Sequence, residues 1–209
     1  MSLLFRGIAI GFSIAAPVGP IGLLCIRRTL TDGRAAGLAT GLGAATADAI
    51  YGCMAAFGLT ALTGVLISAQ TWVRLLGGAF LLYLGVRTFV ARPGAQAAEA
   101  RGAGLLGAGL FGAYISTFGL TLTNPMTILS FVAVFAALGL GTTHPEALAA
   151  ATLVLGVFLG SALWWLTLSG AVGAIRGRFD APALRWVNRI SGGIITAFGV
   201  AAVLSLVFR

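Results

Sequence analysis

The chain has 209 residues, of which 59 % are hydrophobic and only 9 % are charged, and its mean hydropathy is +1.04. A soluble domain carries about 25 % charged residues, so this chain has too little polar material for a water-soluble surface and is predicted to be an integral membrane protein. Its net charge of +8 comes from arginines at the ends of apolar runs, where they orient helices and meet lipid headgroups, so no nucleic-acid partner is expected.

Apolar runs follow one another along the chain, and a span needs about 20 such residues. Backbone polar groups cannot stay unpaired in lipid, so we expect helices rather than strands. The second and fourth runs exceed one membrane thickness, which predicts a second helix that is tilted or ends in an interfacial turn, and a fourth helix that is bent or broken. The six predicted transmembrane helices are Leu3–Ile26, Ala35–Ser68, Trp72–Val90, Leu105–Leu140, Ala147–Ile175 and Ile190–Phe208.

Polar breaks separate these runs, and the arginines are unevenly distributed among them. The segment 27–34, with Arg27 and Arg28, is interpreted as a charged turn after the first span, and Arg176–Arg189 as a basic linker before the sixth. Loops on the cytoplasmic side are enriched in arginine. The loops after the first, third and fifth spans are therefore predicted to be cytoplasmic, with both termini outside.

The two halves of the chain are similar in pattern. Helix breakers interrupt the first span of each half, at Pro17-Val18-Gly19-Pro20 and at Asn124-Pro125, and Arg74–Gly78 resembles Arg189–Gly193. Three spans per repeat is an odd number, so the second repeat enters the membrane inverted, an architecture of secondary transporters. The expected division is a first repeat at 1–92, a linker at 93–104 and a second repeat at 105–209.

The interruptions in the first and fourth spans point to a binding site. Proline lacks an N–H and clashes with the preceding turn, so the helix opens there and leaves backbone groups that a polar substrate or water can satisfy. The alternative is an ordinary proline kink satisfied by threonine hydroxyls. The candidate residues of this broken-helix site are Pro17, Gly19, Pro20, Thr123, Asn124 and Pro125.

Asp48 is the only charged residue between Ala35 and Gly58. A charge at bilayer depth costs roughly 2.5 to 3.5 kcal/mol, so an acid there is a candidate for function. Burial disfavours the charged form, which suits a group that takes up and releases a proton, and a carboxylate also attracts the ammonium of a zwitterion. Competition between proton and substrate would then give antiport. The alternative is a neutral aspartic acid bonded to a neighbouring helix.

Small residues share the helical face of Asp48, because their positions fall within roughly 40° of it at 100° per residue. Such a face allows close helix approach or leaves room for a small ligand. Gly41 is included among the candidate site residues for this reason. The residues of this face are Gly37, Gly41, Ala44 and Gly52.

These features resemble the LysE family, which includes the homoserine and threonine exporters of the RhtB type. The matching motifs are the PVGP of the first span, Gly33–Gly37–Gly41 followed by Asp48, Asn124-Pro125, Trp164-Trp165 and Gly192-Gly193. The resemblance implies a transporter rather than an enzyme. It implies export of amino acids or related metabolites from the bacterial cytoplasm, driven by the proton gradient.

Two motifs depart from the family pattern. The family usually has PGP where this chain has Pro17-Val18-Gly19-Pro20, and Asn-Pro-Lys where this chain has Met126 after Asn124-Pro125. If that lysine meets a substrate carboxylate in relatives, this chain lacks it. Arg27 and Arg28, placed at the membrane edge, are not obvious replacements.

Other functions remain open on the sequence. A divalent metal-ion exporter would use Asp48 with Cys25 and Cys53, but no ligand cluster is visible, so neither a metal nor another cofactor is expected. A thiol-relay redox carrier needs a cysteine in each half, and a membrane enzyme needs a catalytic constellation, which His144 in a loop does not supply. The expected partners are an amino acid, protons and lipid, and the glycines Gly33–Gly41 could serve either packing within the chain or the face of a homodimer.

Overall fold

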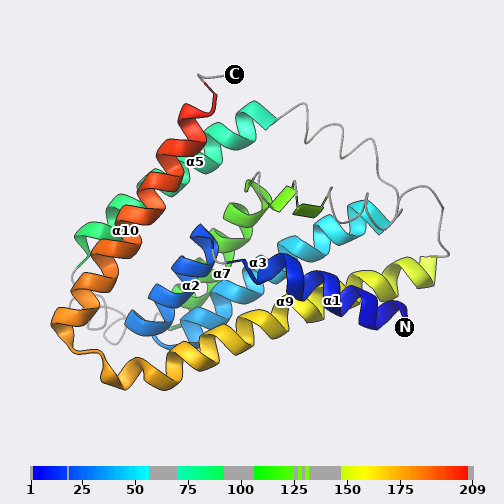
Figure 1. Ribbon diagram of the computed structural model, residues 1–209, viewed down its shortest axis with the longest axis horizontal. Coiled ribbons are helices and arrows are strands. Elements are labelled where there is room, and N and C mark those ends of the chain that lie inside the picture. Colours follow the sequence, from blue (N-terminus) through cyan, green and yellow to red (C-terminus); the bar gives the residue numbers. More distant parts are fainter. Residues whose placement is uncertain are drawn as a thin grey trace.

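The computed structural model describes residues 2–17, 19–56, 70–91, 106–124, 127–128, 130–131 and 147–206. All regular structure in these ranges is helical, which confirms the all-α class (Figure 1). The predicted third and fifth spans coincide closely with α5 and α9. The helices are α1 (Leu3–Ala15), α2 (Pro20–Thr31), α3 (Arg34–Ala56), α5 (Gln70–Val90), α7 (Leu106–Leu122), α9 (Ala147–Ile175) and α10 (Ala181–Leu204), with a short 3₁₀ turn η1 (Arg176–Arg178) between the last two.

The first predicted span is broken where the prolines predict. The axes of α1 and α2 are bent by 83°. Pro20 occupies the first turn of α2, where its missing N–H costs no hydrogen bond, and the Leu23 N–H donates to the Gly19 carbonyl at 3.0 Å. The break therefore follows from the local sequence.

The fourth span is interrupted in a similar way. Helix α7 ends at Leu122, and the Ile128 N–H donates to the Asn124 carbonyl at 3.2 Å, so a new helical turn begins at Asn124. Pro125 lies outside the described residues.

The predicted charged turn at 27–34 is wrong for Arg27 and Arg28. Helix α2 continues to Thr31, so both arginines are helical and buried. The reversal into α3 needs only Asp32, the last-turn cap, and Gly33, whose φ of +107° is a conformation that glycine adopts without steric cost. A charged residue near a helix end does not by itself end the helix.

The predicted basic linker at 176–189 is wrong in its second half. Helix α10 begins at Ala181, so Arg185 and Arg189 are helical. The Asp180 carboxylate accepts the Ala183 N–H at 2.8 Å, and a proline follows in the first turn. This pair of start signals outweighs the local charge in setting where the helix begins.

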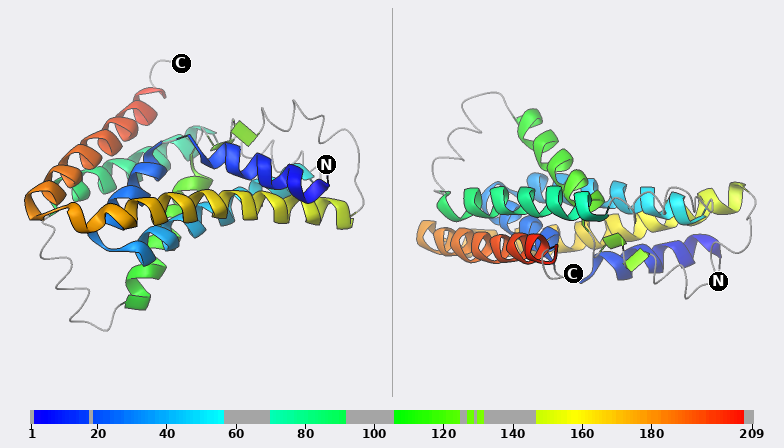
Figure 2. Two further views of the ribbon diagram at one scale, coloured as in Figure 1. Left: turned by 60° about the horizontal axis from the view of Figure 1, so that its bottom comes forward. Right: turned by 90° about the horizontal axis from the view of Figure 1, so that it is seen from above.

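The main helix contacts join opposite halves of the chain, parallel for α1–α9 and α3–α7 and antiparallel for α3–α9 and α5–α10. Helix α1 lies along α9, α3 packs against both α7 and α9, α5 lies beside α10, and α2 contacts α3, α9 and α10 (Figures 1 and 2). The α1–α9 contact is close because glycines line it. A Cβ at Gly11 would meet the Val157 backbone, and one at Gly160 would meet the Ile8 backbone.

Two of the described helices, Ala147–Arg178 and Ala181–Leu204, are long and apolar enough to cross a membrane. The bent pair α1–α2 counts as a third span if it forms one broken crossing, and Leu75–Val90 and Gly109–Leu122 are shorter apolar helices. Parts of the second and fourth runs and the linker 93–104 lie outside the described ranges. The count of six spans and the division into two repeats therefore stay predictions.

Candidate functional site

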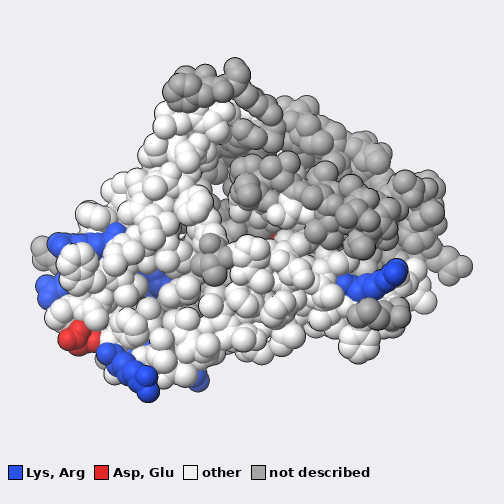
Figure 3. All heavy atoms as spheres, viewed as in Figure 1, with Lys and Arg blue, Asp and Glu red and all other residues white. Residues whose placement is uncertain are grey.

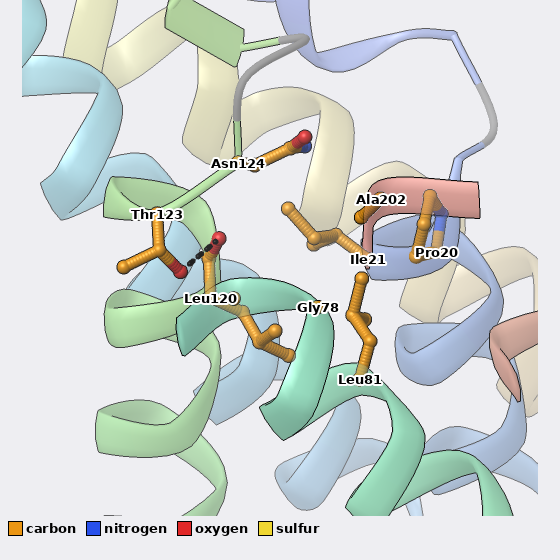
Figure 4. Close-up of a pocket in the computed structure, with 9 residues that line it drawn as sticks. Pro20, Ile21, Gly78, Leu81, Leu120, Thr123, Asn124 and Ala202 are labelled. Atoms are coloured by element: carbon orange, nitrogen blue, oxygen red, sulfur yellow. Dashed lines mark hydrogen bonds between the residues drawn. The ribbon is translucent and has the colours of Figure 1, made fainter. Parts of the chain in front are cut away.

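The two broken helices meet at a small cavity (Figure 4). Of the predicted site residues, Pro20, Thr123 and Asn124 line it. Its volume of about 20 Å³ has room for a water molecule but not for an amino acid. The other lining residues are Ile21, Gly77, Gly78, Leu81, Leu120 and Ala202.

The polar groups at this cavity differ in orientation. Figure 4 shows the Asn124 amide pointing toward the side formed by α2. The Thr123 hydroxyl instead donates back to the Gly119 and Leu120 carbonyls of α7, at 2.9 and 3.3 Å. Thr123 therefore satisfies the end of its own helix, as the proline-kink alternative expects. Pro17 is exposed and, like Gly19, is not among the lining residues.

Asp48 lies elsewhere, in the interface between α3 and α9. Its side chain is 3 % exposed and accepts a hydrogen bond of 2.6 Å from the Ser161 hydroxyl. The Trp165 indole N–H in turn donates to the Ser161 oxygen at 3.1 Å. Within the described part of the chain, no cation forms an ion pair with Asp48. The carboxyl group is therefore held by neutral groups of the opposite half of the chain.

The small-residue face around Asp48 is used for close helix approach. A Cβ at Gly41 would meet the Trp165 side chain, and one at Gly37 would meet Thr29 and Ser169. Gly41 therefore packs within the chain and does not line the cavity. Ile21 connects the two places, because it lines the cavity and also packs in the cluster that contains Trp165.

Arg28 is a functional candidate that sequence analysis missed. Its side chain is only 9 % exposed and joins α2 to α3 and α7. The Nη2 group donates to Ser116 Oγ at 2.8 Å. The Nη1 group donates at 3.0 Å to Thr40 Oγ1, Thr117 Oγ1 and the Ala113 carbonyl. The available signal was the pair Ser116-Thr117 inside an apolar run, which offers acceptors to a buried cation.

Other arginines bind the same end of the bundle. The Arg27 Nε donates to Asn188 Oδ1 at 3.0 Å, and Arg176 donates to the Leu30 and Thr31 carbonyls at the end of α2. Figure 3 shows most of the arginines on this face gathered where α9, η1 and α10 meet. This arginine-rich end contains the α2–α3 and α9–α10 connections, which the charge distribution predicts to be cytoplasmic.

No group of three histidine, cysteine, aspartate or glutamate side chains suited to a metal ion is found among the described residues. Cys25 and Cys53 are free thiols, and Cys25 is buried with its sulfur 3.5 Å from the Gly37 carbonyl.

Apolar helices that break in mid-run, with a buried carboxyl and a buried guanidinium among them, are typical of multi-pass membrane transport proteins. Residues 12–206 match the model of the LysE type translocator, so the chain belongs to this family. Membership makes it a membrane exporter and implies a bacterial inner membrane. The resemblance inferred from the motifs is confirmed.

Two curated relatives resemble the chain over most of its length. One is "Putative amino acid efflux protein YcgF" of Bacillus subtilis (strain 168), 27 % identical over 204 residues, which cover 95 % of this chain and 94 % of the relative. The other is "Uncharacterized membrane protein YahN" of Escherichia coli (strain K12), 28 % identical over 185 residues, which cover 84 % and 77 % respectively. No solved structure matches the chain.

The link from Asp48 through Ser161 to Trp165 leads to a stability prediction. We expect Ser161→Ala to destabilise the protein by about 1–3 kcal/mol, because it removes the partner of a buried carboxyl and of a buried indole N–H. The measurement is the thermal midpoint of the purified protein in detergent. Ser169→Ala is the control, because Ser169 is equally buried on α9 but bonds only to carbonyls of its own helix. Equal losses in the two variants would contradict the prediction.

Proposed function

We propose that this chain exports an amino acid or a related small zwitterionic metabolite from the cytoplasm in exchange for protons. The observation that carries the proposal is Asp48, a buried carboxyl whose described hydrogen-bond partner is a neutral hydroxyl on α9. Burial without a cationic partner disfavours the ionised form, so the group suits reversible protonation. The amino-acid efflux relative supports the substrate class.

The helix pairing supports an inverted repeat in this transporter. The first three predicted spans contain α1–α2, α3 and α5, and the next three contain α7, α9 and α10. In an inverted repeat, α1 corresponds to α7, α3 to α9 and α5 to α10. Exchanging the members of these pairs turns the α1–α9 contact into the α7–α3 contact. The α3–α9 and α5–α10 contacts are each converted into themselves. This is the pairing that a two-fold axis in the membrane plane would produce.

The proton and the substrate occupy different places in this proposal. Asp48 takes the proton between α3 and α9, while the substrate passes the broken helices, where Pro20 and Asn124 line the cavity. The cavity must enlarge to admit a substrate, as alternating access requires. Ile21 contacts both regions, so movement of α2 is a physical route by which protonation and opening become coupled.

Counterflow in proteoliposomes tests the proposed function. Vesicles are loaded with one unlabelled amino acid at a time and diluted into a trace mixture of radiolabelled amino acids, with and without an imposed pH gradient. We expect uptake of label above that of protein-free vesicles for at least one amino acid, and a change in its rate when the gradient is applied. No exchange of any amino acid, or exchange only of divalent cations in a parallel assay, would contradict the proposal.

A further inference from the structure

A buried apolar layer separates the cavity from the buried arginines. Its four side chains come from α2, α5, α7 and α10, and none is more than 9 % exposed. They pack against one another, so water and polar solutes are excluded between the cavity and the arginine-rich end. The members of this layer are Leu24, Leu84, Leu120 and Ile195.

The order of side chains is the same along each of these helices. On α2, the cavity residue Ile21 is followed after one turn by Leu24 and after another by Arg28. On α7, read backwards, Asn124 is followed by Leu120 and then by Thr117, which binds Arg28. Cavity, apolar layer and polar layer are therefore stacked along one line.

Helices α5 and α10 repeat this order. Leu81 of α5 lines the cavity, Leu84 lies in the apolar layer, and the buried Thr88 follows. On α10, Ile195 lies between the cavity residue Ala202 and Asn188, which binds Arg27. Four helices thus surround a single stack of layers.

Arg28 lies beyond the apolar layer, and some N–H groups of its guanidinium form no hydrogen bond with a described residue. Its hydrogen bonds use Nη1 and one N–H of Nη2, so Nε–H and the other Nη2–H donate to no residue that the structure describes. Nε and Nη2 lie on one edge of the guanidinium, and that edge matches the two oxygens of a carboxylate. Asp32, the next acid along the chain, is exposed; its backbone N–H donates to the Arg28 carbonyl at 2.8 Å, but its carboxylate forms no described hydrogen bond or ion pair with the Arg28 guanidinium.

We propose that the substrate's route runs between α2, α5, α7 and α10, that the Leu24–Leu84–Leu120–Ile195 layer is its closed gate, and that Arg28 receives the substrate's carboxylate on the arginine-rich side of that gate. The inference rests on the proposed function, since it names the group of the substrate that this side recognises. Arg28 bonds α2 to α3 and to the gate helix α7, and a carboxylate would supply an anionic hydrogen-bond partner, which no described residue gives its guanidinium.

Charge-selective thiol labelling tests the route and the role of Arg28. The background carries Cys25→Ala and Cys53→Ala, and Leu84→Cys places a thiol in the gate. Anionic sulfonatoethyl and cationic trimethylammonioethyl methanethiosulfonate are applied from the arginine-rich side of membrane vesicles. The matched control is Val86→Cys, two residues away on α5 and 54 % exposed on the outer surface.

We expect the Leu84→Cys thiol to react faster with the anionic reagent than with the cationic one. Adding Arg28→Gln should lower this preference about tenfold, which is at the low end of the rate enhancements that charged clefts produce. Arg28→Lys should retain most of the preference. Val86→Cys should show no effect of Arg28. A thermal midpoint in detergent reports whether each variant is folded. If Arg28→Gln does not fold, Ser116→Asp neutralises the guanidinium in place and should lower the preference similarly.

A Leu84→Cys thiol that reacts no faster than the Val86→Cys thiol with either reagent would overturn the route. A charge preference that neither Arg28→Gln nor Ser116→Asp lowers would overturn the role of Arg28. Labelling needs neither an amino acid nor a pH gradient. A chain that passes this test but fails amino-acid counterflow would therefore contradict the proposed substrate and keep the route.

Discussion

The Asp48→Asn protein is expected to exchange amino acids without responding to a pH gradient. Asparagine has nearly the shape of a protonated aspartic acid and can keep a hydrogen bond with Ser161, so the α3–α9 interface should remain intact. It cannot release a proton. With one proton exchanged per substrate, a gradient of one pH unit drives about tenfold accumulation in the wild type, and this ratio should fall to about one in the variant.

Proteoliposomes containing the counterflow substrate provide the measurement, with label accumulation followed before and after the gradient is imposed. Asp32→Asn is the control, because Asp32 is an exposed acid at the end of α2 and should leave accumulation unchanged. Gradient-driven accumulation that survives in Asp48→Asn would assign proton coupling to another group and leave Asp48 with a structural role.

A single added methyl group at Gly160 is expected to destabilise the bundle. Its Cβ would meet the Ile8 backbone of α1, and backbone cannot move aside as a flexible side chain can. Overpacking of a close contact typically costs 1–3 kcal/mol, so Gly160→Ala should lower the thermal midpoint clearly in detergent. The loss should be accompanied by weaker transport, because α1 leads directly into the broken segment at Pro20.

Gly170→Ala on the same helix is the matched control. A Cβ at Gly170 meets nothing within 4 Å, so this variant gains the helix propensity of alanine, about 1 kcal/mol, without a clash. The two variants share this propensity effect, and the difference between them isolates the contact with α1. Equal midpoints would mean that α1 and α9 are not closely packed in solution.

Local signals were sufficient for the helix breaks and for much of the helix pattern. Pro20 and Gly19 predicted the end of the first straight segment, and the structure begins α2 at Pro20. The fifth predicted span, Ala147–Ile175, has the bounds of α9. These features depend on backbone chemistry within a few residues, which a single sequence contains in full.

Charge was a weaker guide than backbone chemistry. The sequence predicts a charged turn at Arg27 and Arg28, and isolated arginines are costly in an apolar layer. The tertiary structure removes much of that cost, since Thr40, Thr117 and Asn188 come from three other helices to accept their hydrogen bonds. Partners that are far apart in sequence cannot be inferred from the residues beside the arginine.

The sequence by itself determined the membrane class, the family and the identity of Asp48 as the unusual acid, because these depend on composition and short motifs. Only the tertiary structure decided which of the candidate site residues lie close together. It separated Asp48 and Gly41, packed between α3 and α9, from Asn124 and Pro20 at the cavity. The reason is physical, because the register and rotation of packed helices follow from side-chain fit between segments that are distant in the chain. The sequence of one helix does not show which helix it packs against or in which register.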